Sequence, residues 1–318
     1  VLASTLRTEG IGPALQEAAI TMTGAYNFIP AALPAVTPFL PLHRLSYIGL
    51  NTFYYFVPWL LLTSYYLSSI GTYPQRTRRN IFIFCCVFLG FMPLAWKPLL
   101  AGMPDIGSVA LASVVLILYQ RRRDRHTQLV HFTMGVLLVA MVVFRRYFAF
   151  WAVGFFTAMV IDQLLMRSVS WKKRFQEMLL TGAGALFALA LAGKSFIQML
   201  TVNYGQAYQG YLSLYPLYDF LHNILFVSFG VPIILVSCMG TATLVHNKDT
   251  RQITLFLLAQ SFVSTWLFTR VQSFAIHHFL LLLPFISYVL VHGTLYLYQR
   301  IQTTGYRRLL IGTLIGFQ

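Results

Sequence analysis

The residue whose type and position are best suited to chemistry is Asp105, in the polar turn 96–108 between the apolar runs 81–95 and 106–119. It is one of only eight carboxylates in the chain, and Lys97 stands in the same turn. At the head of a predicted helix, Asp105 could cap the N-terminus, where the helix dipole favours negative charge. It could also pair with Lys97, or hold a metal ion, a sugar hydroxyl or an acceptor. These roles are compatible with one another.

A second group is the pair Arg145 and Arg146, followed by aromatic residues, between the apolar runs 128–144 and 147–166. A guanidinium group can meet a phosphate through two parallel hydrogen bonds, which a lysine cannot do. The pair therefore predicts a clamp on an anionic lipid. The alternative is that both arginines extend to lipid headgroups beside a belt of aromatic side chains.

A third group is Arg270 with the adjacent His277 and His278. Neighbouring residues lie about 100° apart on a helix, so the histidines do not form the pair that zinc sites use. They could contact a phosphate or hydroxyl, or pack at the membrane edge. Tyr204 begins a tyrosine-rich segment that suits contact with sugars or headgroups, and equally suits an interfacial aromatic belt.

The composition places these residues in a membrane protein. The 318 residues are 58% hydrophobic and 10% charged, whereas a soluble domain has about 25% charged residues. The net charge of +15 does not indicate nucleic-acid binding, because no basic run alternates with aromatics on a hydrophilic face. The three cysteines lie inside apolar runs and predict neither disulfides nor a metal site.

Repeated apolar runs of about 15–25 residues predict an all-α, polytopic bundle of about ten transmembrane helices. The runs are 46–70, 81–96, 106–120, 128–144, 147–166, 176–198, 220–245, 252–269, 276–298 and 309–318. Asn51 and Pro58 in the first run predict a kinked helix packed inside the bundle. Gly182 and Gly184 are predicted to be sites of close helix packing.

The basic residues predict the orientation of the bundle. Sixteen of the 23 lysines and arginines fall in alternate loops, which are therefore predicted to be cytoplasmic. These loops are 71–80, 121–127, 167–175, 246–251 and 299–308. The segments predicted to face the periplasm or lumen are 1–45, 97–105, 145–146, 199–219 and 270–275. All the candidate site residues then lie on the outer side of the membrane.

The chain is predicted to have two parts. Residues 1–45 form an outer loop with an amphipathic interfacial helix that begins at Gly12-Pro13. Its apolar face is predicted to comprise Leu15, Ala18, Ala19 and Met22. Residues 46–318 form the transmembrane domain. The start at Val1 and the stop inside an apolar run lead us to expect a longer protein at both ends.

This layout resembles the GT-C class of integral membrane glycosyltransferases, such as protein O-mannosyltransferases and lipid A aminoarabinose transferases. The likeness rests on the interfacial helix in 1–45, the Gly-Met-Pro-Asp turn at 102–105, the Arg-Arg-Tyr turn at 145–147, and Arg270 with His277 and His278 before Pro284. It covers most of the chain in layout, through short motifs.

The resemblance implies transfer of a sugar from a polyprenyl-phosphate donor to a lipid, glycan or protein acceptor at the outer face of a bacterial inner membrane. It implies a role for Asp105 in catalysis and for Lys97, Arg145, Arg146, Tyr204, Arg270, His277 and His278 in substrate binding. The class places a catalytic acid early in the first outer loop, so the general base is expected upstream of Val1. Glu9 and Glu17 are the acids left in that segment.

Other functions remain open at this stage. The same cations could serve a transporter or flippase of an anionic lipid or sugar, or an O-antigen ligase or polymerase. Internal repeats would favour a transporter, and the sequence shows none. The pattern calls for no cofactor, although a divalent metal at Asp105 is left open, and the partners expected are membrane lipids rather than nucleic acid.

Overall fold

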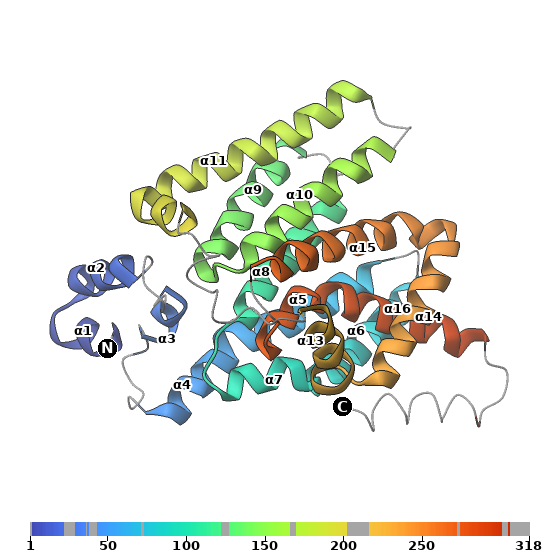
Figure 1. Cartoon of the computed structure of the whole chain (residues 1–318), viewed down its shortest axis with the longest axis horizontal. Helices are drawn as coiled ribbons and strands as arrows, with labels where there is room; N and C mark the ends of the chain where they lie inside the picture. Colours follow the sequence, from blue (N-terminus) through green and yellow to red (C-terminus); the bar gives the residue numbers. More distant parts are fainter. Residues whose placement is uncertain are drawn as a thin grey trace. The chain divides into compact units, whose positions relative to one another are not determined.

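The computed structural model of the chain is all-α (Figure 1). The structure describes residues 2–21, 29–35, 37, 43–70, 73–121, 127–165, 170–201, 216–271, 274–300 and 305. Of the predicted apolar runs, those from 46–70 to 276–298 coincide with helices, and 309–318 lies outside the described residues. The helical prediction is therefore confirmed where it can be compared.

The chain divides into two compact units. The first unit comprises Val1–Trp59, Pro98–Ala152 and Met166–Ala207. The second comprises Leu60–Lys97, Val153–Leu165 and Tyr208–Gln318.

The first unit contains α1 (Leu2–Thr8), α2 (Ile11–Thr21), η1 (Ile29–Ala31), α3 (Ala32–Ala35), α4 (Arg44–Asn51), η2 (Thr52–Phe56), α8 (Ile106–Gln120), α9 (Thr127–Phe144) and α11 (Trp171–Thr201). Helix α9 packs against both α8 and α11, and Figure 1 shows α9 and α11 side by side. A Cβ on Gly184 would lie 2.0 Å from the Phe132 carbonyl oxygen, and one on Gly135 would lie 2.0 Å from the Thr181 carbonyl oxygen. The α9–α11 contact therefore depends on glycines that let two backbones touch, as in packed membrane helices.

The second unit contains α6 (Gln75–Gly90), α13 (Pro216–His222), η5 (Asn223–Ser228), α14 (Val231–His246), α15 (Lys248–Thr269), η6 (Ile276–Leu281) and α16 (Leu283–Arg300). Helices α5 (Val57–Ser69), α7 (Pro93–Leu100) and α10 (Phe148–Leu165) cross from one unit to the other. Helix α14 packs against α16, where a Cβ on Gly293 would lie 2.5 Å from the Gly240 Cα atom. The same glycine-mediated contact thus recurs in this unit.

Within the described part of the chain, two helical segments, Trp171–Lys194 and Lys248–Thr269, are long and apolar enough to cross a membrane alone. Two bent pairs raise the number to four if each pair is one span: Gln75–Gly90 with Pro93–Leu100, bent by 48°, and Leu217–Ser228 with Val231–His246, bent by 106°. Shorter apolar helices include Ile106–Gln120 and Phe148–Leu164. These helices suggest an integral membrane protein with two to four candidate spans, and the count of ten stays a prediction.

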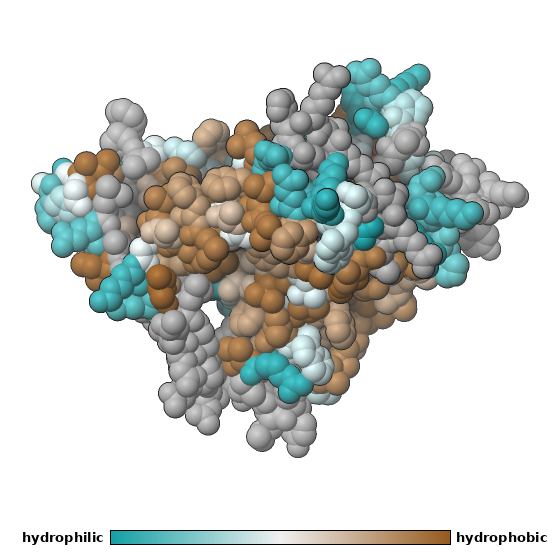
Figure 2. Space-filling view, turned by 90° about the horizontal axis from the view of Figure 1, so that it is seen from above, coloured by the Kyte–Doolittle hydropathy of each residue, from teal (hydrophilic) through white to brown (hydrophobic). Residues whose placement is uncertain are grey.

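The surface fits this interpretation. Large hydrophobic side chains are exposed along the candidate spans, among them Leu186, Leu191 and Phe262. Figure 2 shows hydrophobic residues over much of one face. In water such a surface would drive aggregation, whereas in a bilayer it meets acyl chains.

The structure also tests the predictions for the run around Asn51 and for the apolar face of α2. Near Asn51 and Pro58 the helix passes through the π-helical turn η2, where the Val57 amide donates to the Thr52 carbonyl oxygen. Asn51 is fully buried, but Phe53 is 67% exposed and Leu61 is 47% exposed, so only one side of this run is packed inside the protein. In α2, Ala14 and Ala18 are buried against Leu6, Ala31 and Ala32. The described part of the apolar face therefore packs on the chain's own helices and includes Ala14, which the predicted face omitted.

Candidate functional site

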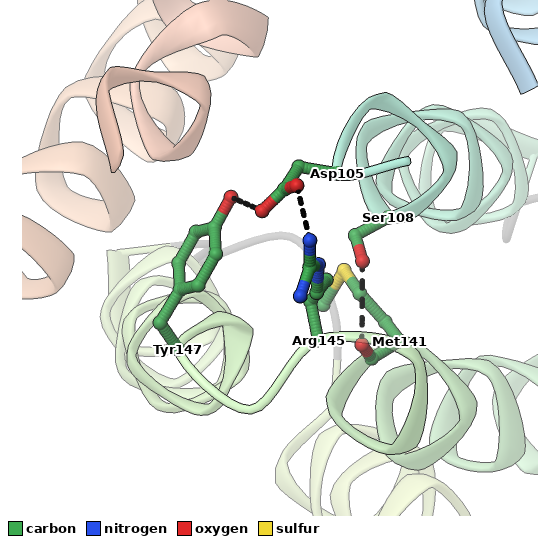
Figure 3. A network of polar contacts seen from close by, with 5 residues as sticks. All are labelled: Asp105, Ser108, Met141, Arg145 and Tyr147. Atoms are coloured by element: carbon green, nitrogen blue, oxygen red, sulfur yellow. Dashed lines mark hydrogen bonds and ion pairs between the residues drawn. The ribbon is translucent and has the colours of Figure 1, made fainter. Parts of the chain in front are cut away.

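The most connected polar group among the candidate residues is formed by Asp105, Arg145 and Tyr147 (Figure 3). Arg145 Nη2 donates to Asp105 Oδ2 at 2.7 Å, and the Tyr147 hydroxyl donates to Asp105 Oδ1 at 2.9 Å. The Asp105 side chain is 1% exposed and the Arg145 side chain 25% exposed. The structure thus brings together two residues that were predicted as separate candidates and lie 40 positions apart in the sequence. They form an ion pair in which Asp105 is buried and part of the Arg145 side chain remains exposed.

The turn before α8 positions Asp105. Helix α7 ends in a Schellman motif, with Met103 N–H bonded to the Pro98 carbonyl and Gly102 N–H to the Leu99 carbonyl. Gly102 has a φ of +85°, which a residue with a Cβ rarely adopts. This sharp stop places Asp105 at the N-cap position of α8.

Asp105 does not cap α8 with its side chain, because its carboxylate makes no hydrogen bond to the first turn of the helix. The capping interpretation is therefore wrong. Both carboxylate oxygens instead accept hydrogen bonds from the Arg145 and Tyr147 side chains.

The turn between α9 and α10 supplies the two donors. The Arg145 amide bonds to the Met141 carbonyl and continues the α9 ladder, while the Phe148 amide bonds to the Arg145 carbonyl and starts α10. In Figure 3, Arg145 and Tyr147 both point from this turn toward Asp105. Ser108 Oγ also faces the Met141 carbonyl oxygen at 3.5 Å, a weak contact between α8 and α9.

A glycine lets α8 approach this turn closely. A Cβ on Gly107 would lie 2.6 Å from the Phe144 ring and 2.9 Å from the Tyr55 ring. Those two rings pack edge to face, with centroids 5.0 Å apart. Because Gly107 has no side chain, the Phe144 ring, which directly precedes Arg145, can pack over the start of α8.

The charges of the group reinforce one another. Burial alone lowers the pKa of Arg145, but the neighbouring Asp105 carboxylate more than offsets it, so the pKa is raised. Burial, with the charge of Asp105 as the next cause, raises the pKa of Tyr147 well above its ordinary value. Arg145 therefore remains charged, and Tyr147 remains a neutral hydrogen-bond donor, at physiological pH.

The guanidinium group of Arg145 has unused hydrogen-bonding capacity. Its Nε atom is buried without a hydrogen-bond partner in the described part of the chain. A buried donor without a partner is costly, and such groups often face a ligand or water. Arg146, the other predicted clamp residue, is half-buried.

The remaining candidates of the second unit lie in other surroundings. Lys97 is exposed, and its Nζ atom lies 3.4 Å from the Val227 carbonyl oxygen. Arg270 is exposed and lies over the Trp266 ring, 4.4 Å from its centroid. His278 is buried, and its Nδ1 atom accepts the Ala275 amide at 3.0 Å. The centroids of the His277 and His278 rings are 3.9 Å apart.

Three further candidates come from the segments predicted to face outward. Glu17 Oε2 accepts a hydrogen bond from Thr5 Oγ1 at 2.8 Å, which ties α2 to α1. Glu9 is exposed. Tyr204 lies outside the described residues. Among the described residues, no three His, Cys, Asp or Glu side chains are grouped as a metal site would require.

A polar group between α9 and α11 was not predicted. His131 on α9 is fully buried; its Nδ1 atom lies 3.3 Å from Thr181 Oγ1, and its Nε2 atom lies 3.7 Å from Glu177 Oε2 on α11. The signal that could have found it is an ionisable residue inside each of two apolar runs, since such residues are rare in spans and usually functional.

Comparison of the chain with protein-family models, with curated proteins and with solved structures gives no match. The function must therefore be inferred from the structure itself. The protein is all-helical with several long apolar helices, which is consistent with a membrane protein, and it has a buried Asp–Arg–Tyr group beside the start of α8.

Proposed function

We propose that this protein is a membrane glycosyltransferase that moves a sugar from a polyprenyl-phosphate donor to an acceptor at the outer face of the membrane. The observation that carries the proposal is the Asp105–Arg145–Tyr147 group. It presents a fixed guanidinium at the junction of two apolar helices, which is where the phosphate of a lipid-linked sugar would lie.

The positive-inside distribution supports an outer location for this group. The turns 97–105 and 145–146 alternate with the strongly basic loops along the chain. Helix α8 has 15 residues, which at 1.5 Å per residue covers about 22 Å of the ~30 Å apolar core. The group would therefore be recessed below the headgroups, where a bound phosphate would offset the cost of the two arginines.

The proposed roles follow from exposure. Asp105 is almost fully buried and has both oxygens engaged, so we assign it as a positioning residue for Arg145. Arg145, with the more exposed side chain, is the residue proposed to contact the donor phosphate, with Arg146 beside it. A guanidinium can bind a carboxylate and a phosphate through different N–H groups at the same time.

The reaction proposed is a single displacement. A general base takes the proton from an acceptor hydroxyl or amine, and the freed electron pair attacks the anomeric carbon. The bond from that carbon to the phosphate oxygen breaks, and polyprenyl phosphate leaves with its negative charge facing Arg145. The base is not assigned to a described residue, because Asp105 is engaged and Glu17 is bonded to Thr5.

The proposal is tested with the full-length protein in nanodiscs, with a membrane extract that supplies lipid, glycan and protein acceptors, and with a panel of tritiated undecaprenyl-phosphate sugars that includes arabinose, mannose and glucose derivatives. We expect at least one donor to lose its sugar label, and we expect Arg145→Ala to abolish this loss. Donors that stay intact over the whole panel would count against a transferase.

One observation favours a second candidate, a transporter. Thr181 Oγ1 donates its proton to the Glu177 carbonyl, so its oxygen accepts from His131 Nδ1, and Nε2 then faces the Glu177 carboxylate. That arrangement is stable when a proton is shared between His131 and Glu177, and intramembrane sites of this kind occur in proton-coupled carriers. If an intact labelled lipid crosses the membrane of proteoliposomes, and if this movement depends on a pH gradient, the result would favour the transporter over the transferase.

A further inference from the structure

The second unit contains a helix that turns sharply before the apolar helix α14. Leu217–Ser228 meets Val231–His246 at an angle of 106°. The bend lies at Phe229 and Gly230, and Gly230 has a φ of +82°, a conformation suited to glycine. If α14 runs across the membrane, the preceding helix must run along its surface.

One face of this helix is apolar and exposed. Leu217, Tyr218, Leu221 and Phe226 are between 47% and 69% exposed. The rings of Tyr218, His222 and Phe226 follow one another along this face, with centroid separations of 6.1 Å and 5.6 Å. The face therefore combines aliphatic and aromatic bulk with a phenol and an imidazole, groups that suit a boundary between hydrocarbon and water.

The opposite face is fixed to the unit. The Phe220 ring packs against the Phe274 and Phe279 rings, with centroids 5.1 Å and 5.6 Å away. Asn223 Nδ2 donates to the Phe274 carbonyl oxygen at 3.0 Å. The helix is thus held in one orientation, and its exposed apolar face points away from these contacts.

An independent marker gives the level of this helix in the membrane. Helix α15, which is long enough to span alone, carries exposed Phe262 and Trp266 before its end, and Arg270 lies over the Trp266 ring. Tryptophan and arginine in this arrangement are typical of the headgroup boundary. Phe274, which anchors the bent helix, follows Arg270 by four residues.

We propose that Leu217–Ser228 is an interfacial helix that lies in the plane of a phospholipid bilayer. Its Leu217, Tyr218, Leu221 and Phe226 side chains insert at the boundary between headgroups and acyl chains. The right-angle bend and the Trp266–Arg270 marker select a lipid surface as the partner of this face. An interfacial helix of this kind inserts its apolar side about 5–10 Å.

The test uses nitroxide labels on single cysteines in nanodiscs of phosphatidylcholine and phosphatidylglycerol. The background variant carries Cys85→Ala, Cys86→Ala and Cys238→Ala. Labels are placed by Leu217→Cys, Leu221→Cys and Phe226→Cys on the exposed face. Matched controls are Leu235→Cys and Met239→Cys on the exposed side of α14, and Lys248→Cys at a polar helix start.

The readout is the ratio of label accessibility to oxygen and to a water-soluble nickel chelate, which reports depth. We expect positions 217, 221 and 226 to share one shallow depth, with 235 and 239 progressively deeper and 248 in water. Depths that rise from 217 to 226 would indicate a continuing span and contradict the proposal. Nickel accessibility equal to that at 248, or exclusion of both reagents by a second copy or another protein, would also contradict it.

Discussion

At the scale of residues, the arrangement of Arg145 explains why a buried carboxylate stands at the start of α8. Asp105 accepts hydrogen bonds from two side chains that follow α9, and its charge raises the pKa of Arg145 despite burial. A charged arginine held by one fixed hydrogen bond keeps the rest of its guanidinium in a defined direction. The pair therefore acts as a positioned cation rather than as two separate charges.

The contribution of the ion pair is predicted to exceed that of a helix cap. Asp105→Asn keeps a hydrogen-bonding oxygen and removes the charge, so we expect a loss of about 1.5–3 kcal/mol in the free energy of unfolding. The matched control is Asp249→Asn in the first turn of α15, an exposed position where we expect a change within about 0.5 kcal/mol. Thermal unfolding in detergent provides the comparison. Equal stability of Asp105→Asn and the parent would show that the ion pair does not stabilise the fold.

The Tyr147 hydroxyl is predicted to give the protein a stability that depends on alkaline pH. The pKa of Tyr147 is raised above its ordinary value of 10.0 in the folded state. Its contribution is therefore constant below about pH 10 and is lost as the pH rises further, because the unfolded chain ionises first. We expect the decline in melting temperature above pH 10 to be smaller in Tyr147→Phe, and an unchanged decline would contradict the burial of the Tyr147 hydroxyl beside Asp105.

At the scale of elements, helix packing depends on glycines at particular positions. Gly184 lies against the Phe132 backbone of α9, whereas nothing lies within 4 Å of a Cβ built on Gly182 in the same helix. The sequence predicted both as packing glycines, and the structure confirms only Gly184. The spacing of glycines shows that two helices could meet closely, but only the helix orientation decides which glycine faces the partner.

These two glycines provide a matched pair of substitutions. Gly184→Ala must push α9 and α11 apart, because its methyl group would meet a backbone oxygen that cannot move aside. We expect a clear loss of thermal stability, of the 1–3 kcal/mol order seen for overpacked cores. Gly182→Ala should be neutral or stabilising by up to about 1 kcal/mol, since alanine favours the helix. Equal effects of the two substitutions would contradict the close α9–α11 contact.

The helical elements could be predicted from the sequence because long apolar runs must satisfy their backbone groups internally. Their bends and partners could not. The sequence offered the Asp105 carboxylate a helix N-terminus, Lys97, a metal ion, a sugar hydroxyl or an acceptor as partners. Its pairing with Arg145 depends on how the turn after α9 folds back on α8. The His131–Glu177 contact likewise requires two helices to be in register, which neither run reveals alone.

At the scale of the whole molecule, the distribution of basic residues remains the main argument for orientation. It predicts that the loops around 123 and 173 are cytoplasmic and that 199–219 faces outward. In a cysteine-free background, an impermeant thiol reagent should label Asn203→Cys in intact cells and Lys173→Cys only after permeabilisation. Strong labelling of Lys173→Cys in intact cells would place the Asp105–Arg145–Tyr147 group on the inner face and end the argument for an outward site.

The central claim is that Arg145, held by Asp105, binds the phosphate of a polyprenyl lipid. The most direct measurement is the affinity of undecaprenyl phosphate for the protein in nanodiscs, with undecaprenol as the ligand that lacks the charge. Arg145→Lys keeps the charge but lacks the rigid, planar guanidinium, whose separate nitrogen atoms can meet Asp105 and a phosphate at the same time.

We expect Arg145→Lys to weaken undecaprenyl phosphate binding by about 1.5–3 kcal/mol, roughly 10- to 150-fold, with no effect on undecaprenol. Arg44→Lys is the matched control, because Arg44 is exposed and, within the described residues, its side chain donates to the Leu100 carbonyl oxygen at 3.3 Å, which a lysine can also reach. We therefore expect parental affinity for Arg44→Lys and a clear loss for Arg145→Lys. Parental affinity in both Arg145→Lys and Arg145→Ala would contradict it and leave the arginine as a structural partner of Asp105.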